Sequence, residues 1–427
     1  MTIALLFITL FVCLFLTVPI SISLALATFV AIATSYDTNM MNMLAQSMVT
    51  SVDNYALMAI PFFMLLGYIM EKAGIAASLI KLAEAIVGDR PGGLGSASVV
   101  ACMFFAAISG SGPACVAAIG ALLAPSMLRQ GYDKGYTGAL LASGSTIGPV
   151  IPPSIPMIVY GATVGVSITA MFAAGVLPGI MMGLALIIYN RTISKRRGYK
   201  GNPQTVSKLA VLKEAIWAVL MPLIVLGGIY AGIFTPTESA VIGVVYSIIV
   251  GIFVYKQLTW KRFLEGLLES AVMSASVMFV MGGASTFGRV LTLEHLPQLL
   301  TEFLTGVSSA PIVIMLIING ILLIAGMFID TTSNIILFAP LFTPVVSAMG
   351  YNLVYFGLVM VVNLCIGMLT PPLGVNLFVG QAVAGSTFDK VVKEVVPMII
   401  ILVIVLIILI AVPPVSLLIP RLMGLVA

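Results

Sequence analysis

The residues best suited to chemistry form a polar cluster inside an otherwise apolar stretch, GMFIDTTSNIILF at residues 326–338. Asp330 is the one acid in this stretch, and four further polar residues follow it at 331–334. A lone carboxylate in an apolar membrane setting is costly unless it is paired, protonated or bound to a cation. Asp330 is therefore predicted to bind a ligand, and pairing with an interior hydrogen-bond donor is the structural alternative.

A second polar cluster interrupts the apolar stretch AAISGSGPACVAAIG at residues 106–120. Two glycines and Pro113 are predicted to stop a helix there, beside the hydroxyls of Ser109 and Ser111. A helix that stops inside a membrane leaves backbone N–H and C=O groups that lipid cannot satisfy, so protein, water, an ion or a substrate must supply partners. The motif predicts a binding site, and a packing kink capped by serine is the alternative.

Two proline pairs interrupt further apolar spans, in GSTIGPVIPPSIP (144–156) and NLCIGMLTPPLGVN (363–376). Each span is predicted to be unwound there, and the freed carbonyl oxygens suit Na⁺, a hard cation that takes oxygen ligands. Side chains that could complete its shell are Ser145, Thr146, Ser154, Asn363 and Thr370. The positive ends of half-helix dipoles can also face an anion without a buried arginine. Proline kinks used only for packing are the alternative.

The elements that position these residues must lie in a lipid bilayer. Of 427 residues, 61% are hydrophobic and 8% are charged, and the mean hydropathy is +1.20, which leaves too few polar residues to cover a soluble fold. Runs such as PMIIILVIVLIILIAV (397–412) are apolar on all sides, unlike the alternating strands of a membrane barrel. The sequence predicts an all-α polytopic membrane protein with about eight to eleven membrane passes.

Other classes of protein are excluded by what the sequence lacks. The four cysteines lie singly in apolar runs without CxxC spacing, so neither a disulfide nor a transition-metal site is expected. The net charge of +4 comes from basic loops that border the spans, so no nucleic-acid partner is expected. No Ser/His pair, second buried carboxylate or metal cluster supports catalysis, so the chain is predicted not to be an enzyme and to have no catalytic residue.

The interrupted elements occur twice in the chain. Residues 106–165 align without gaps with residues 325–384, a shift of 219, and the coincident residues include prolines and glycines that set special backbone geometry. The matched pairs are Pro125 and Pro344, Pro152 and Pro371, Pro153 and Pro372, Gly131 and Gly350, Gly138 and Gly357, Gly148 and Gly367, and Gly161 and Gly380. The sequence therefore predicts an internal duplication.

The placement of charge predicts that the two copies are inverted. The connections around the first copy carry five basic residues, and the positive-inside rule assigns them to the cytoplasm: Lys72, Lys81, Arg90, Arg129 and Lys134. Arg289 is the only Lys or Arg in the corresponding connections of the second copy, at 286–310 and 346–354. That end of the second copy is therefore predicted to face outward.

The chain is predicted to consist of five parts with two re-entrant hairpins and two broken helices. These are an N-terminal scaffold helix and outer loop at 1–54, a first inverted repeat at 55–190 with its hairpin at 92–128, a basic cytoplasmic loop and scaffold helix pair at 191–261, a second inverted repeat at 262–412 with its hairpin at 310–346, and a C-terminal tail at 413–427.

Three strings resemble signatures of one family. They are SGSGPA (109–114), GPVIPPSIPMIVYG (148–161) and GGIYAGIFTPTESA (227–240). They resemble the large membrane subunit of tripartite ATP-independent periplasmic (TRAP) transporters, and the likeness covers the whole chain. The overall sequence is most similar to members that import sialic acid, and importers of C4-dicarboxylates look similar.

This resemblance implies a Na⁺-coupled importer of an organic acid in the bacterial inner membrane, working by an elevator mechanism. A small membrane subunit and a periplasmic substrate-binding protein are the implied partners, and Na⁺ is the coupling ion with no other cofactor. Glu238 of the TPTES string is expected to cap or brace a scaffold break.

The resemblance also assigns site residues. Substrate contacts are expected at Ser109, Ser154 and Asp330. Sodium is expected between each hairpin tip and the break that follows it, at Ser109, Ser111, Gly112, Gly144, Gly148, Thr331, Thr332, Ser333, Asn363, Gly367 and Thr370. A stand-alone elevator-type symporter or exchanger and a membrane-embedded enzyme are the competing hypotheses, the second of them weakened by the missing catalytic groups.

Overall fold

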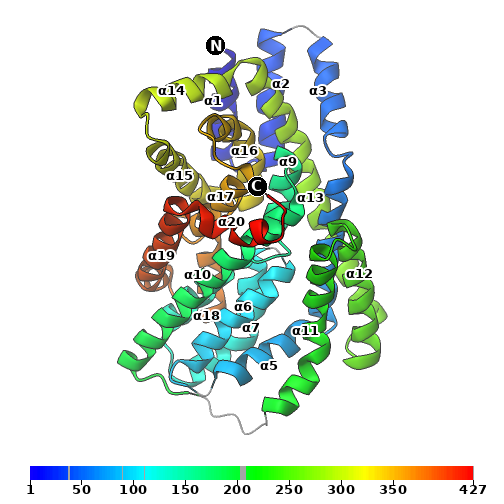
Figure 1. The fold of residues 1–427 in the computed structure, drawn as a ribbon, viewed down its shortest axis with the longest axis vertical. Coiled ribbons are helices and arrows are strands. Elements are labelled where there is room, and N and C mark those ends of the chain that lie inside the picture. Colours follow the sequence, from blue (N-terminus) through cyan, green and yellow to red (C-terminus); the bar gives the residue numbers. More distant parts are fainter. Residues whose placement is uncertain (37–38, 89, 110, 202–207, 427) are drawn as a thin grey trace.

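The computed structural model describes residues 1–36, 39–88, 90–109, 111–201 and 208–426. Within these ranges the regular structure is helical and includes no strand. Nine helical segments of the described chain are long and apolar enough to cross a membrane. The predicted all-α polytopic fold is confirmed (Figure 1).

The N-terminal part differs from the single helix and loop predicted for 1–54. It forms three helices, α1 (Thr2–Phe15), α2 (Ile20–Ser35) and α3 (Asn39–Thr50). The first two are separated at Pro19, which is the residue before α2 and cannot continue the hydrogen bonds of α1. The expected loop is helical because Met40, Met41 and Leu44 pack against the apolar core, and α3 contacts α2 and α13.

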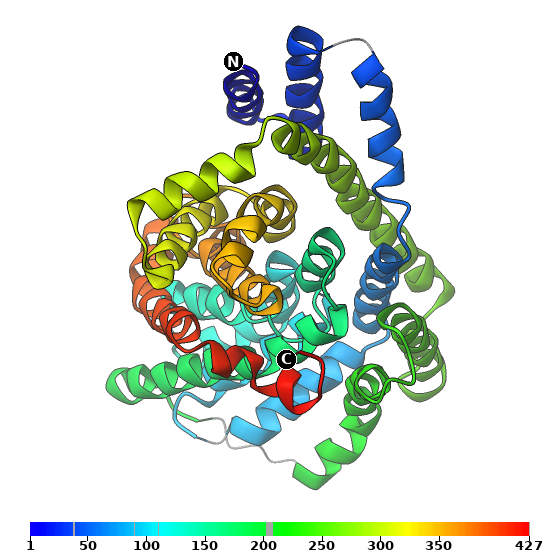
Figure 2. The same ribbon diagram turned by 45° about the horizontal axis from the view of Figure 1, so that its top comes forward.

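Four helices form one side of the molecule. They are α4 (Ala59–Lys72), which follows a short 3-10 turn η1 (Tyr55–Met58), α11 (Lys208–Tyr230), α12 (Pro236–Ile249) with a π-helical turn η2 (Val250–Val254), and α13 (Trp260–Leu293). Figure 2 shows α3, α4 and α11–α13 along one side of the hairpin helices. The expectation for Glu238 is confirmed, since its carboxylate accepts from the backbone N–H of Thr235 at 2.8 Å in a capping box that starts α12.

Both predicted hairpins and both broken spans are present. The first hairpin is α6 (Gly93–Ser109) and α7 (Gly112–Arg129), followed by the broken span α8 (Lys134–Ser145) and α9 (Ile155–Val164) and by α10 (Ile168–Arg197). The second hairpin is α15 (Pro311–Phe328) and α16 (Thr331–Ala348), followed by the broken span α17 (Leu353–Gly367) and α18 (Val375–Ala384) and by α19 (Phe388–Ala411).

The duplication extends to the residues that begin the helices. Starting with α6, the five helices of the first copy have counterparts that begin 218 to 220 residues later. Ser111 caps α7 and its counterpart Asp330 caps α16, while Asp133 caps α8 and its counterpart Asn352 caps α17. In Figure 1 the first hairpin lies in the lower half of the molecule and the second in the upper half, in agreement with inverted copies.

The two copies interleave rather than packing side by side. Helix α18 of the second copy packs against α7 and α8 of the first, and α9 of the first copy packs against α16 and α17 of the second. At the crossing of α8 and α18, a Cβ on Gly380 would lie 2.6 Å from the carbonyl oxygen of Gly138. Only glycine permits the two backbones to approach this closely.

Three further helices were not predicted. α5 (Ile75–Val87) and α14 (Leu296–Val307) are amphipathic helices that precede the first and second hairpins. The tail predicted at 413–427 contains α20 (Pro413–Leu422), which packs against α10, α17 and α19. The last span ends at Ala411 because Pro413 and Pro414 follow it, and proline N–H groups are missing from the ladder of hydrogen bonds.

The basic connection is shorter than the cytoplasmic loop predicted from residue 191. Helix α10 continues to Arg197, whose guanidinium pairs with the Glu394 carboxylate of α19 at 2.8 Å. Residues 202–207 of the predicted loop lie outside the described chain.

Replacing Gly380 by alanine is expected to lower stability by about 1–3 kcal/mol, because the added methyl group must push the α8 and α18 backbones apart. The melting temperature of the purified protein in detergent measures the effect. Gly320→Ala in α15 is the matched control, since a Cβ there meets nothing within 4 Å and alanine is the better helix former. Equal melting temperatures for the two variants would contradict the close crossing.

Candidate functional site

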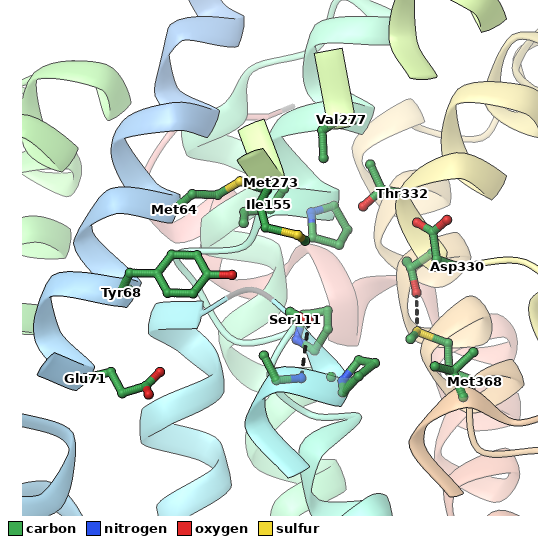
Figure 3. Close-up of a pocket in the computed structure, with 18 residues that line it drawn as sticks. Met64, Tyr68, Glu71, Ser111, Ile155, Met273, Val277, Asp330, Thr332 and Met368 are labelled. Atoms are coloured by element: carbon green, nitrogen blue, oxygen red, sulfur yellow. Dashed lines mark hydrogen bonds between the residues drawn. The ribbon is translucent and has the colours of Figure 1, made fainter. Parts of the chain in front are cut away.

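A cavity of roughly 340 Å³ lies where the hairpin tips, the breaks and the long helices α4 and α13 meet. Its lining is drawn in Figure 3, with α4 on one side and the second hairpin tip on the other. The lining residues are Met64, Gly67, Tyr68, Glu71, Ser111, Gly112, Pro113, Ala114, Pro149, Ile155, Pro156, Met273, Val277, Asp330, Thr331, Thr332, Met368 and Val375.

Four helices begin at this cavity, two from each copy. The first residues of α7, α9, α16 and α18 all line it: Gly112, Ile155, Thr331 and Val375. The first turn of a helix has N–H groups without intrahelical partners and carries a partial positive charge of about half a unit. No Lys or Arg is among the described lining residues. Backbone dipoles are therefore the main positive field in the cavity.

The two hairpin tips use equivalent capping residues that differ in charge. Ser111 Oγ accepts from the backbone N–H of Ala114 at 3.5 Å. Asp330 accepts from the backbone N–H of Ser333 at 3.0 Å and from the Ser333 hydroxyl at 2.5 Å, and it remains exposed to the cavity. Each of the two residues therefore accepts hydrogen bonds at the start of a helix, as their structural alternatives require. Both residues also line the cavity.

Five of the predicted site residues are brought together at the cavity. They are Ser111, Gly112, Asp330, Thr331 and Thr332. The side chain of Ser109, predicted to contact both substrate and ion, lies outside the part of the chain that the structure describes. Nothing further is assigned to that residue.

The other predicted residues do not line the cavity. They are Gly144, Gly148, Ser154, Ser333, Asn363, Gly367 and Thr370, which are buried or, for Thr370, half-buried, and which are not part of the lining. Ser154 caps α9 by accepting from the N–H of Met157 at 3.3 Å, and its hydroxyl donates to the carbonyl of Pro149. The Thr370 hydroxyl donates to the carbonyl of Ile366 at 2.8 Å. In this conformation Ser154 is a positioning group for the break rather than part of the cavity wall.

Buried amide groups lie close to the second hairpin and the second break. Asn363 Nδ2 donates to Asn319 Oδ1 at 2.7 Å and to the Asn319 carbonyl at 2.8 Å, while Asn363 Oδ1 has no hydrogen-bond partner. Asn334 Nδ2 donates to the carbonyl of Ile329 at 2.8 Å, and its Oδ1 also has no partner. Buried oxygen acceptors without partners are costly, so a ligand or ion is their natural complement.

Asn376 is a further buried amide that sequence reasoning missed. Both of its side-chain polar atoms lack a hydrogen-bond partner, and the amide lies against Gly112, where a Cβ would be 2.8 Å from Asn376 Oδ1. This places a side chain of the second break at the tip of the first hairpin. The sequence offered only the adjacent proline pair as a signal, because the contact joins residues that are far apart in the chain.

The wall that faces the tips was also missed. It consists of Met64, Tyr68 and Glu71 of α4 and of Met273 and Val277 of α13 (Figure 3). These residues lie on ordinary apolar spans, whose sequence carries no break or motif. Their proximity to the tips follows only from the packing of α4 and α13.

This arrangement defines a class: a helical membrane transporter with inverted repeats, in which interrupted helices line a cavity. The family description "Tripartite ATP-independent periplasmic transporter, DctM component" matches residues 7–415. The chain belongs to this family of TRAP large permeases, which is a transporter family and not a class of enzymes. It is a multi-pass protein of the bacterial inner membrane.

Named relatives differ in their substrates. The chain is 42% identical over 385 residues to the isethionate TRAP transporter permease protein DctMQ of Oleidesulfovibrio alaskensis, with 90% of this chain and 60% of that one covered. It is 39% identical to the C4-dicarboxylate TRAP transporter large permease protein DctM of Pseudomonas aeruginosa, with 90% of each covered. It is 38% identical to the sialic acid TRAP transporter large permease protein SiaM of Vibrio cholerae, with 96% of each covered.

A solved structure shares the fold. It is the crystal structure of the Alcanivorax borkumensis YdaH transporter, with a TM-score of 0.62 over 91% of this chain and 90% of that one. The sequence identity is 14%, so this likeness shows the fold alone.

Asp330→Asn is expected to reduce substrate uptake at least tenfold while leaving stability nearly unchanged. Asparagine caps a helix about as well as aspartate, so the substitution removes the charge and keeps the cap. Asp133→Asn is the matched control, because Asp133 caps α8 in the same way, by accepting from Tyr136 N–H at 3.1 Å, and is not part of the cavity lining. Normal uptake by the Asp330→Asn protein would show that its carboxylate serves only as a cap.

Proposed function

We propose that this chain is the membrane permease of a Na⁺-coupled importer for an organic acid anion, with sialic acid as the first candidate substrate and a C4-dicarboxylate as the alternative. A periplasmic binding protein would deliver the anion, and a small membrane subunit would complete the complex. The convergence of four helix N-termini on one cavity is the observation that carries the proposal.

Binding of an anion is supported by the field and by the size of the cavity. Four helix N-termini offer N–H donors and partial positive charge to an oxyanion, in a space that fits a small organic acid. Asp330 and the hydroxyls of Thr332 and Ser111 would accept from or donate to the hydroxyl groups of the same substrate. Isethionate, C4-dicarboxylates and sialic acid, the substrates in the names of the relatives, all carry an acidic group.

Coupling to Na⁺ is supported by the oxygen atoms that lack partners. Asn334 Oδ1 and Asn363 Oδ1 are buried acceptors at the second tip and the second break, and amide oxygens are ligands that Na⁺ accepts. Their counterparts in the first copy are Cys115 and Gly144, so an ion in that copy would depend on backbone carbonyls and hydroxyls. The two proposed ion sites would then share geometry but differ in ligands.

An elevator movement is supported by the two-sided lining of the cavity. One side belongs to α4 and α13, and the other belongs to the interleaved hairpins and broken spans. The interleaved group includes both tips and both breaks, so it can carry ions and substrate as one body past α4 and α13. The family's tripartite character supports the two proposed protein partners.

The proposal is tested by uptake into liposomes that contain the chain and its small subunit, with the binding protein added outside. Uptake of labelled sialic acid or succinate is expected to require both partners and an inward Na⁺ gradient, and to fail when K⁺ replaces Na⁺ at equal ionic strength. Uptake that ignores the Na⁺ gradient would contradict coupling. Uptake by the chain alone would favour a stand-alone elevator-type symporter.

A further inference from the structure

A second cavity, of roughly 320 Å³, lies beside the C-terminal half of α13 and the residues that precede α4, further along α13 than the first. It is lined by Ser51, Asn54, Leu57, Ala162, Thr163, Met281, Ala284, Ser285, Gly288, Arg289, Thr292, Ile336 and Pro340. Along α13, Arg289 lies about 18 Å from Val277 of the inner cavity, at 1.5 Å per residue. The positive-inside rule puts this end outside, because α4 runs inward from here to Lys72.

Arg289 supplies this outer cavity with a positive charge that no carboxylate neutralises among the described residues. Arg289 is an exposed residue, and its guanidinium donates a hydrogen bond to Ser47 Oγ of α3 at 3.1 Å. Glu294, the nearest acid in the sequence, instead accepts a 2.5 Å hydrogen bond from the hydroxyl of Tyr36. Most of the N–H groups of Arg289 therefore remain available, and a guanidinium binds carboxylates and sulfonates through two parallel N–H donors.

Neutral polar groups share the lining of this cavity with Arg289. Thr163 Oγ1 at the end of α9 is buried and has no hydrogen-bond partner. Asn54 Oδ1 accepts from the backbone N–H of Ala56 at 2.9 Å, which leaves its two amide N–H donors for another group. Ser51 and Ser285 add hydroxyls to the lining. An oxyanion held by Arg289 would meet additional donors in this cavity.

The two cavities have opposite side-chain charges. The outer one contains Arg289 and no Asp or Glu among its lining residues, whereas the inner one contains Glu71 and Asp330 and no Lys or Arg. An anion is attracted to the outer cavity over distances of several ångströms, while the inner cavity holds it by short-range contacts to helix N-termini. This polarity favours capture on the outside and release on the inside.

We propose that the outer cavity is a reception site for the anionic substrate, where Arg289 binds the carboxylate or sulfonate before the anion reaches the inner cavity. The proposal rests on the proposed function, since it assumes that an organic anion is imported. The competing explanation is that Arg289 only clamps α3 to α13 through Ser47. Ser47→Ala separates the two, because it removes the clamp and keeps the charge.

A cysteine reporter tests the local charge without any transport. Ser285→Cys is made in a Cys13→Ser background, which leaves three buried native cysteines. An anionic methanethiosulfonate reagent is expected to modify Cys at 285 faster, relative to a cationic one, when Arg289 is present. Arg289→Gln should lower this ratio about tenfold, Arg289→Lys should largely preserve it, and Ser47→Ala should leave it unchanged. A ratio of the two rates that is lowered by Ser47→Ala and not by Arg289→Gln would overturn the proposal.

Protection of the same reporter tests reception of the substrate. Succinate, N-acetylneuraminate and isethionate are added before a neutral thiol reagent, with chloride as the control. At least one organic anion is expected to slow the reaction, and Arg289→Gln should raise its half-protecting concentration about tenfold, as expected for loss of a hydrogen bond to a charged group. The three anions distinguish carboxylate from sulfonate recognition. Absence of protection by all three would overturn the proposal.

The proposed function can fail separately from this inference. If liposomes with all partners import none of the three anions, the importer proposal fails, while the reagent ratio still decides whether Arg289 makes the outer cavity attractive to anions. If uptake is normal in wild type and unchanged in Arg289→Gln at limiting substrate, the reception site is excluded and the importer proposal stands.

Discussion

The structure depends on one constraint: a helix that stops inside a membrane leaves backbone polar groups that lipid cannot satisfy. This chain interrupts helices at two hairpin tips and two proline-containing breaks, and the interruptions converge on one interior region instead of facing lipid. Capping side chains satisfy part of the freed backbone, as Ser111 and Asp330 do. The first residues of four helices line the cavity, so partners for the remaining N–H groups of these first turns must come from the protein or from what the cavity holds.

The interleaving of the two copies brings their interrupted helices together at one cavity. Helix α18 packs against helices of the first copy, and α9 packs against helices of the second. Each copy therefore needs a helix of the other copy for its packing. The crossing of α8 and α18 at Gly138 and Gly380 sets how closely the copies approach. Asn376, carried by α18, reaches the first hairpin tip for the same reason. The interleaved elements therefore form one unit that presents both tips to α4 and α13.

The frame is nearly symmetric, but the side chains placed on it are not. The caps of the two tips differ as Ser111 and Asp330, and the buried amides Asn334 and Asn363 have Cys115 and Gly144 as their counterparts. The matched glycines and prolines give the two copies the same backbone geometry. The carboxylate and the two buried amides of these positions occur in the second copy. The second copy also carries Arg289 of the second cavity, whereas the acids of the first cavity come from both copies, as Glu71 and Asp330.

The sequence by itself determined the helical membrane class, the inverted duplication and the presence of two hairpins and two broken helices, because hydropathy, proline and glycine act on the backbone locally and leave a readable pattern. Among the residues that it predicted to bind substrate or sodium, Ser111, Asp330 and Thr332 line the cavity, since polar side chains in apolar stretches stand out. It did not identify Asn376, Tyr68, Glu71 or the helices α5, α14 and α20, and it did not show that Ser154 caps α9 without lining the cavity. Those features depend on contacts between residues distant in the chain, so only the tertiary packing of α4, α13 and the interleaved copies decided them.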